Sequence, residues 1–114
     1  MPFINIKSTI SVDSEMKNEI TENLLKITQE CLGKGENWIM INYDDPTDIY
    51  FQGSTENPSI FVEVKLYGKP QANACQQMTK KATNFLAEKL HVSSQRIYIA
   101  YYPTNIWGWD GNNF

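Results

Sequence analysis

Residues 3–7 read Phe-Ile-Asn-Ile-Lys, and residues 61–65, which lie 58 positions later, read Phe-Val-Glu-Val-Lys. The same shift places Ile-Met-Ile-Asn-Tyr at 39–43 on Ile-Tyr-Ile-Ala-Tyr at 97–101 without a gap. All four segments are short runs rich in β-branched and aromatic residues, which is typical of β-strands. Because like segments recur at one spacing, the sequence indicates two copies of one unit.

Each copy contains a helical pattern between its two strands. Apolar residues recur every three or four positions between residues 13 and 32, which predicts one face of an α-helix. These residues are Met16, Ile20, Leu24, Ile27 and Cys31. Ser11 or Asp13 can cap the start of this helix, and Gly33 suits the left-handed position after its end. We expect the second helix to carry Pro70 in its first turn. Its apolar face consists of Ala74, Met78, Ala82, Phe85 and Leu90.

The order strand, helix, strand in each copy predicts an α+β fold made of a duplicated β-α-β unit. Two such units form a four-stranded mixed sheet with both helices on one face. We expect one domain over residues 1–114, with pseudo-repeats at about 2–58 and 60–114. The helices cover only one side of this sheet, so its bare face is expected to meet solvent or a partner subunit.

Two segments outside this framework contain apolar residues that need a covering surface. A small hairpin is predicted around Asp110-Gly111, a pair that favours turns. Its apolar residues are Ile106, Trp107, Trp109 and Phe114. The segment 44–58 contains an apolar island, Ile49-Tyr50-Phe51, that is long enough to pair at a sheet edge. Both features favour a homo-oligomer.

The composition excludes several classes of function. Ten Lys and Arg against thirteen Asp and Glu give a net charge of -3, so no cationic patch for nucleic acid is expected. No long apolar run indicates a membrane span, and no signal peptide is recognisable at the N-terminus. We therefore expect a cytoplasmic protein, although leaderless secretion leaves no readable signal. Cys31 and Cys75 are expected to be free core thiols, and the single His leaves no metal-ligand spacing.

Several motifs occur together with the duplication. The chain begins Met1-Pro2, Gly33-Lys34 follows the first helix, and Arg96-Ile97-Tyr98-Ile99 opens the last strand. The closing motif is Trp-Gly-Trp-Asp-Gly-Asn-Asn-Phe at 107–114. Over the whole chain this combination resembles the tautomerase superfamily, and within it the branch of macrophage migration inhibitory factor and its bacterial phenylpyruvate tautomerase relatives. The resemblance implies a homotrimer whose sheets surround a central channel, with an active site at each subunit interface.

The resemblance also implies a chemistry. Removal of Met1 would free the nitrogen of Pro2, a secondary amine whose pKa falls toward neutrality in an apolar pocket or near another cation. Such an amine can act as the general base of a keto–enol tautomerase, an isomerase that moves a proton on small α-keto acids such as phenylpyruvate. No cofactor and no metal are implied.

The roles of individual residues follow from the same resemblance. Pro2 is the expected catalytic base, Lys34 holds the substrate carboxylate, and Tyr98 of the neighbouring subunit donates a hydrogen bond. The implied substrate-binding residues are Trp38, Lys65, Leu66, Tyr67, Trp107, Trp109 and Phe114. Lys65 and Leu66 stand where the mammalian cytokine has histidine and serine.

Two other functions stay open at this stage. Ala100 replaces an asparagine of the mammalian cytokine, and this replacement removes one polar substrate contact. A non-catalytic, cytokine-like binding trimer is one alternative. A sister proton-transfer reaction of the superfamily, dehalogenation or decarboxylation, is the other.

Overall fold

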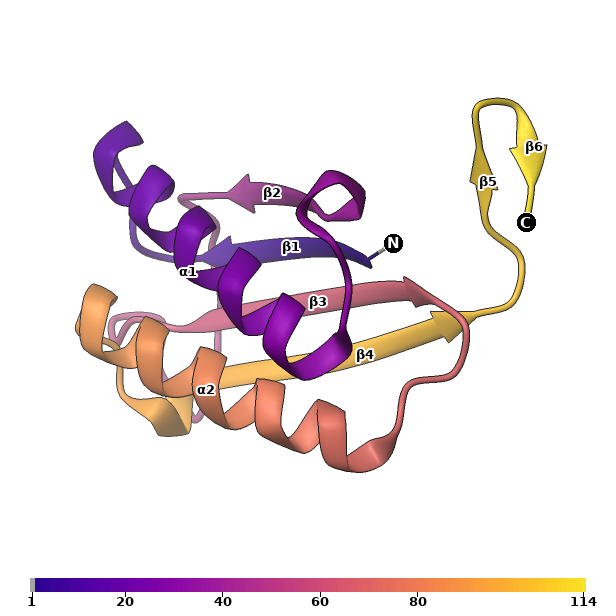
Figure 1. The fold of residues 1–114 in the computed structure, drawn as a ribbon. Helices are drawn as coiled ribbons and strands as arrows, with labels where there is room; N and C mark the ends of the chain where they lie inside the picture. Colours follow the sequence, from indigo (N-terminus) through magenta and orange to yellow (C-terminus); the bar gives the residue numbers. More distant parts are fainter. Residues whose placement is uncertain (1) are drawn as a thin grey trace.

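The computed structural model describes residues 2–114, in which two long helices pack against a four-stranded sheet and a two-stranded hairpin lies near the C-terminus (Figure 1). The expected removal of Met1 falls outside the described residues. The elements, in chain order, are β1 (Pro2–Ser8), α1 (Ser14–Leu32), η1 (Glu36–Trp38), β2 (Met40–Asp44), β3 (Ile60–Tyr67), α2 (Ala72–Leu90), η2 (Ser94–Arg96), β4 (Ile97–Thr104), β5 (Gly108–Trp109) and β6 (Asn112–Asn113). The elements η1 and η2 are single turns of 3-10 helix.

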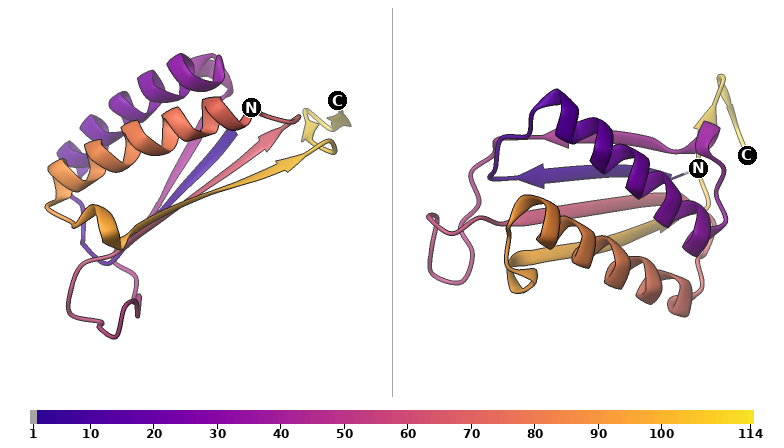
Figure 2. Two further views of the ribbon diagram at one scale, coloured as in Figure 1. Left: turned by 90° about the horizontal axis from the view of Figure 1, so that it is seen from below. Right: turned by 60° about the vertical axis from the view of Figure 1, so that its left-hand side comes forward.

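The sheet has the strand order β2-β1-β3-β4. The pairs β1–β2 and β3–β4 are parallel, and the central pair β1–β3 is antiparallel. Both helices lie on one face of this sheet (Figure 2). The predicted α+β fold, with a four-stranded mixed sheet and two helices on one face, is therefore confirmed. Within the described residues, no helix is long and apolar enough to cross a membrane.

Each copy of the β-α-β unit contains the same hydrogen-bonded contact between its helix and its second strand. In the first unit Thr21 Oγ1 and Tyr43 Oη lie 2.8 Å apart, and Tyr43 Oη also donates to the carbonyl oxygen of Lys17 at 3.0 Å. Thr79 and Tyr101, 58 residues later, repeat the pair at 2.9 Å, and Tyr101 Oη donates to a carbonyl one helical turn earlier. The duplication thus extends to individual hydrogen bonds.

The helix ends follow the sequence signals closely, with one difference. The Asp13 side chain caps α1 by accepting from the Met16 amide at 2.8 Å, and Gly33 ends the helix with φ 66°. The prediction that Pro70 lies in the first turn of α2 is wrong. The backbone is still extended at Gln71, which is the N-cap, so α2 begins at Ala72.

The apolar core lies between the helices and the inner face of the sheet. Strand β3 alternates between buried and less buried residues, because one of its faces meets the helices, and β1 does the same except at the buried Asn5. The core consists of Ile4, Ile6, Val12, Ile20, Leu24, Ile60, Val62, Val64, Leu66, Met78, Ala82, Leu86, Leu90, Val92 and Ile97.

The bare face of the sheet has a polar centre. Asn5 Nδ2 donates to Asp44 at 3.1 Å and to Glu63 at 3.2 Å, although Asn5 is only 8% exposed. Glu63 also forms ion pairs with Lys7 at 3.2 Å and Lys65 at 3.9 Å. Desolvation alone would raise the pKa of Glu63, but the hydrogen bonds from Lys7 and Asn5 and the two lysine charges hold it below its ordinary value. This face is therefore an organised polar surface.

The duplication also includes the segments that follow β2 and β4. Phe51 and Ser54 exchange backbone hydrogen bonds of 3.0 and 3.1 Å across a turn in which Gln52 and Gly53 have positive φ. The C-terminal hairpin (residues 108–113) has the same turn, with φ 52° and 80° at Asp110 and Gly111. The predicted C-terminal hairpin is thus confirmed. The expected apolar island proves to contain a matching turn, which we call the internal hairpin (residues 51–54), and the two project from opposite ends of the sheet (Figure 2).

Candidate active site

Pro2 lines a cavity at the end of the sheet where β1 begins. The residue is less than 2% exposed, and it belongs to the helix-facing side of β1 together with Ile4 and Ile6. The cavity has a volume of about 370 Å³. Its walls come from the starts of β1 and β2, from η1 and from the C-terminal hairpin: Pro2, Phe3, Asn37, Trp38, Ile39, Met40, Trp107, Gly108 and Trp109. A buried proline therefore lies in a pocket whose largest walls are tryptophans.

The end of α1 determines where Trp38 lies. The left-handed backbone at Gly33 terminates the helix, and the chain turns into η1, which carries Trp38 to the cavity. The ring of Trp38 meets the ring of Trp109 edge to face, with centroids 5.1 Å apart. The C-terminal hairpin thereby covers the Pro2 cavity through an aromatic contact.

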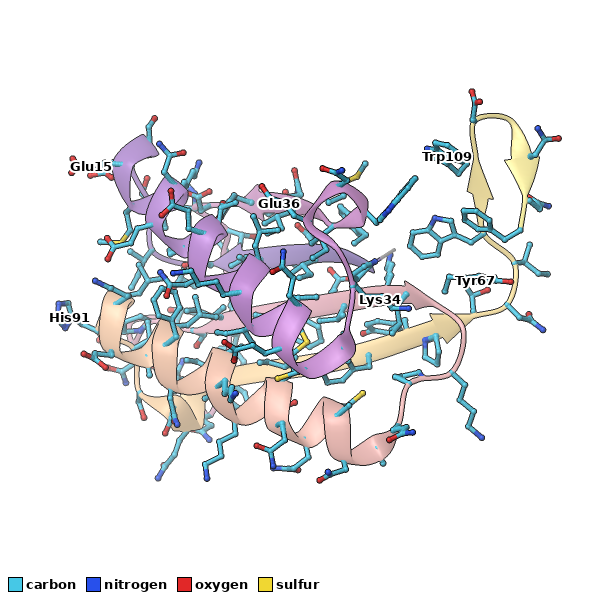
Figure 3. All side chains as sticks on the ribbon, viewed as in Figure 1. Glu15, Lys34, Glu36, Tyr67, His91 and Trp109 are labelled. Atoms are coloured by element: carbon cyan, nitrogen blue, oxygen red, sulfur yellow. The ribbon has the colours of Figure 1, made fainter. Side chains whose placement is uncertain are left out.

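Lys34 lines a second cavity, of about 480 Å³, at the same end of the sheet. Leu66, Tyr67 and Gly68 at the end of β3 line it as well, and Leu66 is the sheet partner of Pro2. Tyr67 also packs against Phe114, with ring centroids 5.3 Å apart. Figure 3 shows Lys34, Tyr67 and Trp109 at this end of the sheet and His91 at the other. The strand pair β1–β3 thus places Pro2 of the first cavity beside Leu66 of the second.

Two of the expected site residues lie away from both cavities. Pro2 is level with Leu66 across the sheet, whereas Tyr98 pairs with Phe61 at the opposite end of β3. Tyr98 is 56% exposed on the bare face. Lys65 lies on the same bare face, where it pairs with Glu63. Within one chain, the structure thus brings Pro2 to the tryptophans but does not bring Tyr98 or Lys65 to them.

Tyr98 instead lines a third cavity, of about 280 Å³, that corresponds to the Pro2 cavity. A shift of 58 residues relates the walls of the two cavities. It pairs Pro2 with Ile60, Phe3 with Phe61, Trp38 with Arg96, Met40 with Tyr98, and residues 49–51 with residues 107–109. Sequence reasoning missed this correspondence, and it missed Phe3, Ile39 and Met40 as cavity walls. The signal was available, because the shift that aligns the strands also aligns Gly53 with Gly111.

The described part of the chain offers no metal centre, since it contains no group of three His, Cys, Asp or Glu side chains placed to hold an ion. Cys31 lines the Lys34 cavity as a free thiol, and Cys75 is also free. Burial raises the pKa of the Cys75 thiol, which disfavours its reactive thiolate.

Comparisons with known proteins agree with this architecture. The family model described as macrophage migration inhibitory factor matches residues 1–114. The macrophage migration inhibitory factor of Xenopus laevis is 28% identical over 119 residues, which cover 100% of this chain and 99% of that protein. The crystal structure of Leishmania major MIF2 superposes with a TM-score of 0.93 at 32% identity, covering 100% of this chain and 97% of that one. The homologue from Prochlorococcus marinus superposes with a TM-score of 0.86 at 29% identity, covering 98% of each chain.

Proposed function

The chain belongs to the macrophage migration inhibitory factor family of the tautomerase superfamily, and from this premise we propose that it is a cofactor-independent keto–enol tautomerase. Its substrates are small α-keto acids such as phenylpyruvate. The observation that supports this proposal most directly is Pro2, buried in a cavity walled by Trp38, Trp107 and Trp109.

The proposed base is the nitrogen of Pro2 after Met1 is removed. A buried amine loses the hydration that stabilises its cation, so a larger share of it is the free base near neutral pH. This base takes a proton from the carbon next to the keto group of the substrate and returns it to the carbonyl oxygen, which yields the enol. The surrounding tryptophans suit a phenyl ring, because aromatic rings pack well edge to face.

Lys34 supplies the charge that this substrate requires. Lys34 lines a cavity together with Leu66, the sheet partner of Pro2, so its ammonium group can bind the substrate carboxylate while the reacting carbon lies near the proline. Leu66 and Tyr67 line the cavity with Lys34, and Leu66 is also the sheet partner of Pro2. We propose that these two residues form the wall between the carboxylate and the phenyl ring of the substrate.

Tyr98 completes the site only if a neighbouring copy of the chain contributes it. Pro2 pairs with Leu66 on β3, and Leu66 pairs with Pro103 on β4. Tyr98 lies five residues before Pro103, so within one chain it is roughly 16 Å along the strand from the level of Pro2. Large apolar side chains near both ends are exposed in the single chain: Met40 67%, Tyr50 73% and Ile106 72%. These exposed side chains support a homotrimer in which the Tyr98 end of one copy meets the Pro2 end of the next.

Ultraviolet absorbance during phenylpyruvate ketonisation tests the proposal, on protein whose mass shows the loss of Met1. We expect catalysis well above buffer, and a loss of at least about a hundredfold in Pro2→Ala, because positioned acid–base catalysis contributes that much. Ser59→Ala is the matched control, since Ser59 lines the equivalent cavity at the other end, and its turnover should stay within about twofold. An inactive protein with a verified Pro2 terminus would contradict the proposal and favour the non-catalytic binding trimer.

A further inference from the structure

Arg96 is buried at the end of the sheet opposite Pro2, and all of its hydrogen bonds go to backbone carbonyl oxygens. It is 7% exposed, and its guanidinium donates to four carbonyl oxygens of the segment that contains the internal hairpin. These are the oxygens of Phe51 at 2.8 Å, Pro58 at 3.0 Å, Asn57 at 3.1 Å and Ser54 at 3.3 Å. A planar fork with this many acceptors holds the segment in one arrangement.

The same segment carries a ring that packs on Tyr98. The ring centroid of Phe51 lies 4.8 Å from that of Tyr98, and the Arg96 guanidinium lies 5.5 Å from the Phe51 ring. Phe61 meets Tyr98 edge to face at 6.3 Å from a second side. The orientation of the exposed Tyr98 therefore depends on a ring that Arg96 holds in place.

The equivalent contact at the other end of the molecule has no such anchor. Trp38 occupies the position of Arg96 in the first copy, and Trp109 occupies the position of Phe51. The aromatic pair Trp38–Trp109 joins side chains only. An arginine at position 96 thus adds backbone hydrogen bonds that cavity packing alone does not require.

We propose that Arg96 is a positioning residue for the tautomerase reaction: it orients Tyr98 through Phe51 and the internal hairpin. This inference rests on the proposed function, because Tyr98 matters to catalysis only if a neighbouring copy uses it as a hydrogen-bond donor. In this proposal Arg96 does not touch substrate, since four of its five N–H donors bind carbonyl oxygens of its own chain.

Steady-state kinetics of Arg96→Lys test the role. Lysine keeps the charge and loses the fork, so the fold is retained while the internal hairpin is held less firmly. We expect kcat for phenylpyruvate to fall about tenfold, with KM within about twofold, because a donor displaced by a fraction of an ångström weakens the transition state more than the ground state. In the Tyr98→Phe background the same substitution should change kcat less than twofold, since the two act as one unit. An equal tenfold loss in both backgrounds would contradict the proposal.

A second readout does not depend on activity. The chain labelled with 3-fluorotyrosine gives a ¹⁹F resonance for Tyr98, assigned by its absence in Tyr98→Phe. We expect Arg96→Lys to shift or broaden this resonance and to leave those of Tyr43 and Tyr101 unchanged, because these two are held by threonines in the helix layer. An unchanged Tyr98 resonance would overturn the positioning role even in an active enzyme. If the wild type is inactive and Arg96→Lys still alters the Tyr98 resonance, the proposed function is refuted, while the effect of Arg96 on Tyr98 stands.

Discussion

At the Pro2 end of the sheet, a cavity of about 370 Å³ lies under a hairpin that Trp109 attaches to Trp38. At the Ile60 end, a cavity of about 280 Å³ lies beside the internal hairpin, and Arg96 binds two carbonyl oxygens of this hairpin and two of the residues that follow it. The two ends are related by the same shift of 58 residues, down to the positive φ values in the two turns.

The difference shows how a duplicated scaffold can separate chemistry from anchoring. Both ends have the same strands, 3-10 turn and hairpin, so the backbone does not distinguish them. Side chains at equivalent positions do: Trp38 against Arg96, and Lys34 against the buried Val92. One end combines a proline, a lysine and an open aromatic pocket, and the other combines a fixed hairpin with an outward-facing tyrosine.

The largest effect on stability is expected from removing the anchor. Arg96→Met should lower the free energy of unfolding by about 3 kcal/mol, because four carbonyl oxygens lose a charge-assisted donor at a buried site. Trp38→Met, at the equivalent position, should cost about 1 kcal/mol, since Trp38 is already 46% exposed. Urea unfolding at equal protein concentrations measures both. Equal losses would mean that the two ends are anchored alike.

The next effect concerns substrate affinity at the Pro2 end. Lys34→Ala should raise KM for phenylpyruvate by about tenfold or more, because a charge-assisted hydrogen bond contributes about 1.5–3 kcal/mol. Lys7→Ala is the matched control, since Lys7 lies on the bare face, pairs with Glu63 and has no role in the proposed site. Its KM should change less than about twofold in the same assay. A larger effect at Lys7 than at Lys34 would place the carboxylate site on the bare face.

A smaller change is expected from opening the aromatic cover. Trp109→Ala should lower kcat/KM for phenylpyruvate by about three- to tenfold, as an aromatic pair contributes about 0.5–1.5 kcal/mol. The same variant should lose less on an α-keto acid without a ring, whose smaller body does not reach Trp109. Competition between the two substrates measures this preference directly. An unchanged preference would exclude Trp109 from the ring pocket.

The smallest predicted difference is in the pH dependence of stability from Tyr43 and Tyr101, the equivalent tyrosines that contact the helices in the two copies. Burial raises the pKa of Tyr101 to about 12, with the hydrogen bond from Thr79 partly opposing the shift. The pKa of Tyr43 is also raised, again by burial first. A raised tyrosine pKa contributes stability below the unfolded value of 10.0, and this contribution is lost as pH rises toward 12.

We therefore expect the urea midpoint of the wild type to fall between pH 9 and 11 more than that of Tyr101→Phe. Tyr43→Phe should remove less of this pH dependence, because only Tyr101 is shifted as far as about 12. Equal pH dependence in the wild type and Tyr101→Phe would show that Tyr101 does not titrate in this way.

Much of the fold could be predicted from the sequence because its signals are local and repeated. Alternating apolar residues at 3–7 and 61–65, helical spacing from Met16 to Cys31, and Gly33 at a left-handed position each have a direct structural cause. The internal hairpin was less visible, because its turn has Gln52 in place of the more typical asparagine or aspartate.

The site was predictable only in part. The resemblance singled out Pro2, Trp38 and Trp109, which the structure places around one cavity. Met40 gave no chemical signal and was found only as the counterpart of Tyr98. How Tyr98 could reach Pro2 depends on how separate copies meet, which the order of residues along one chain does not specify.

The central claim is that the free nitrogen of Pro2 makes one end of a symmetric scaffold reactive. The direct test inserts one alanine between Met1 and Pro2, so that Pro2 keeps its ring and its place in β1 but carries an amide nitrogen. Phenylpyruvate turnover and urea unfolding are then compared with those of the wild type, each with its N-terminus verified by mass. The account predicts a loss of at least about a hundredfold in turnover with little change in stability. Undiminished turnover in the inserted variant would contradict it.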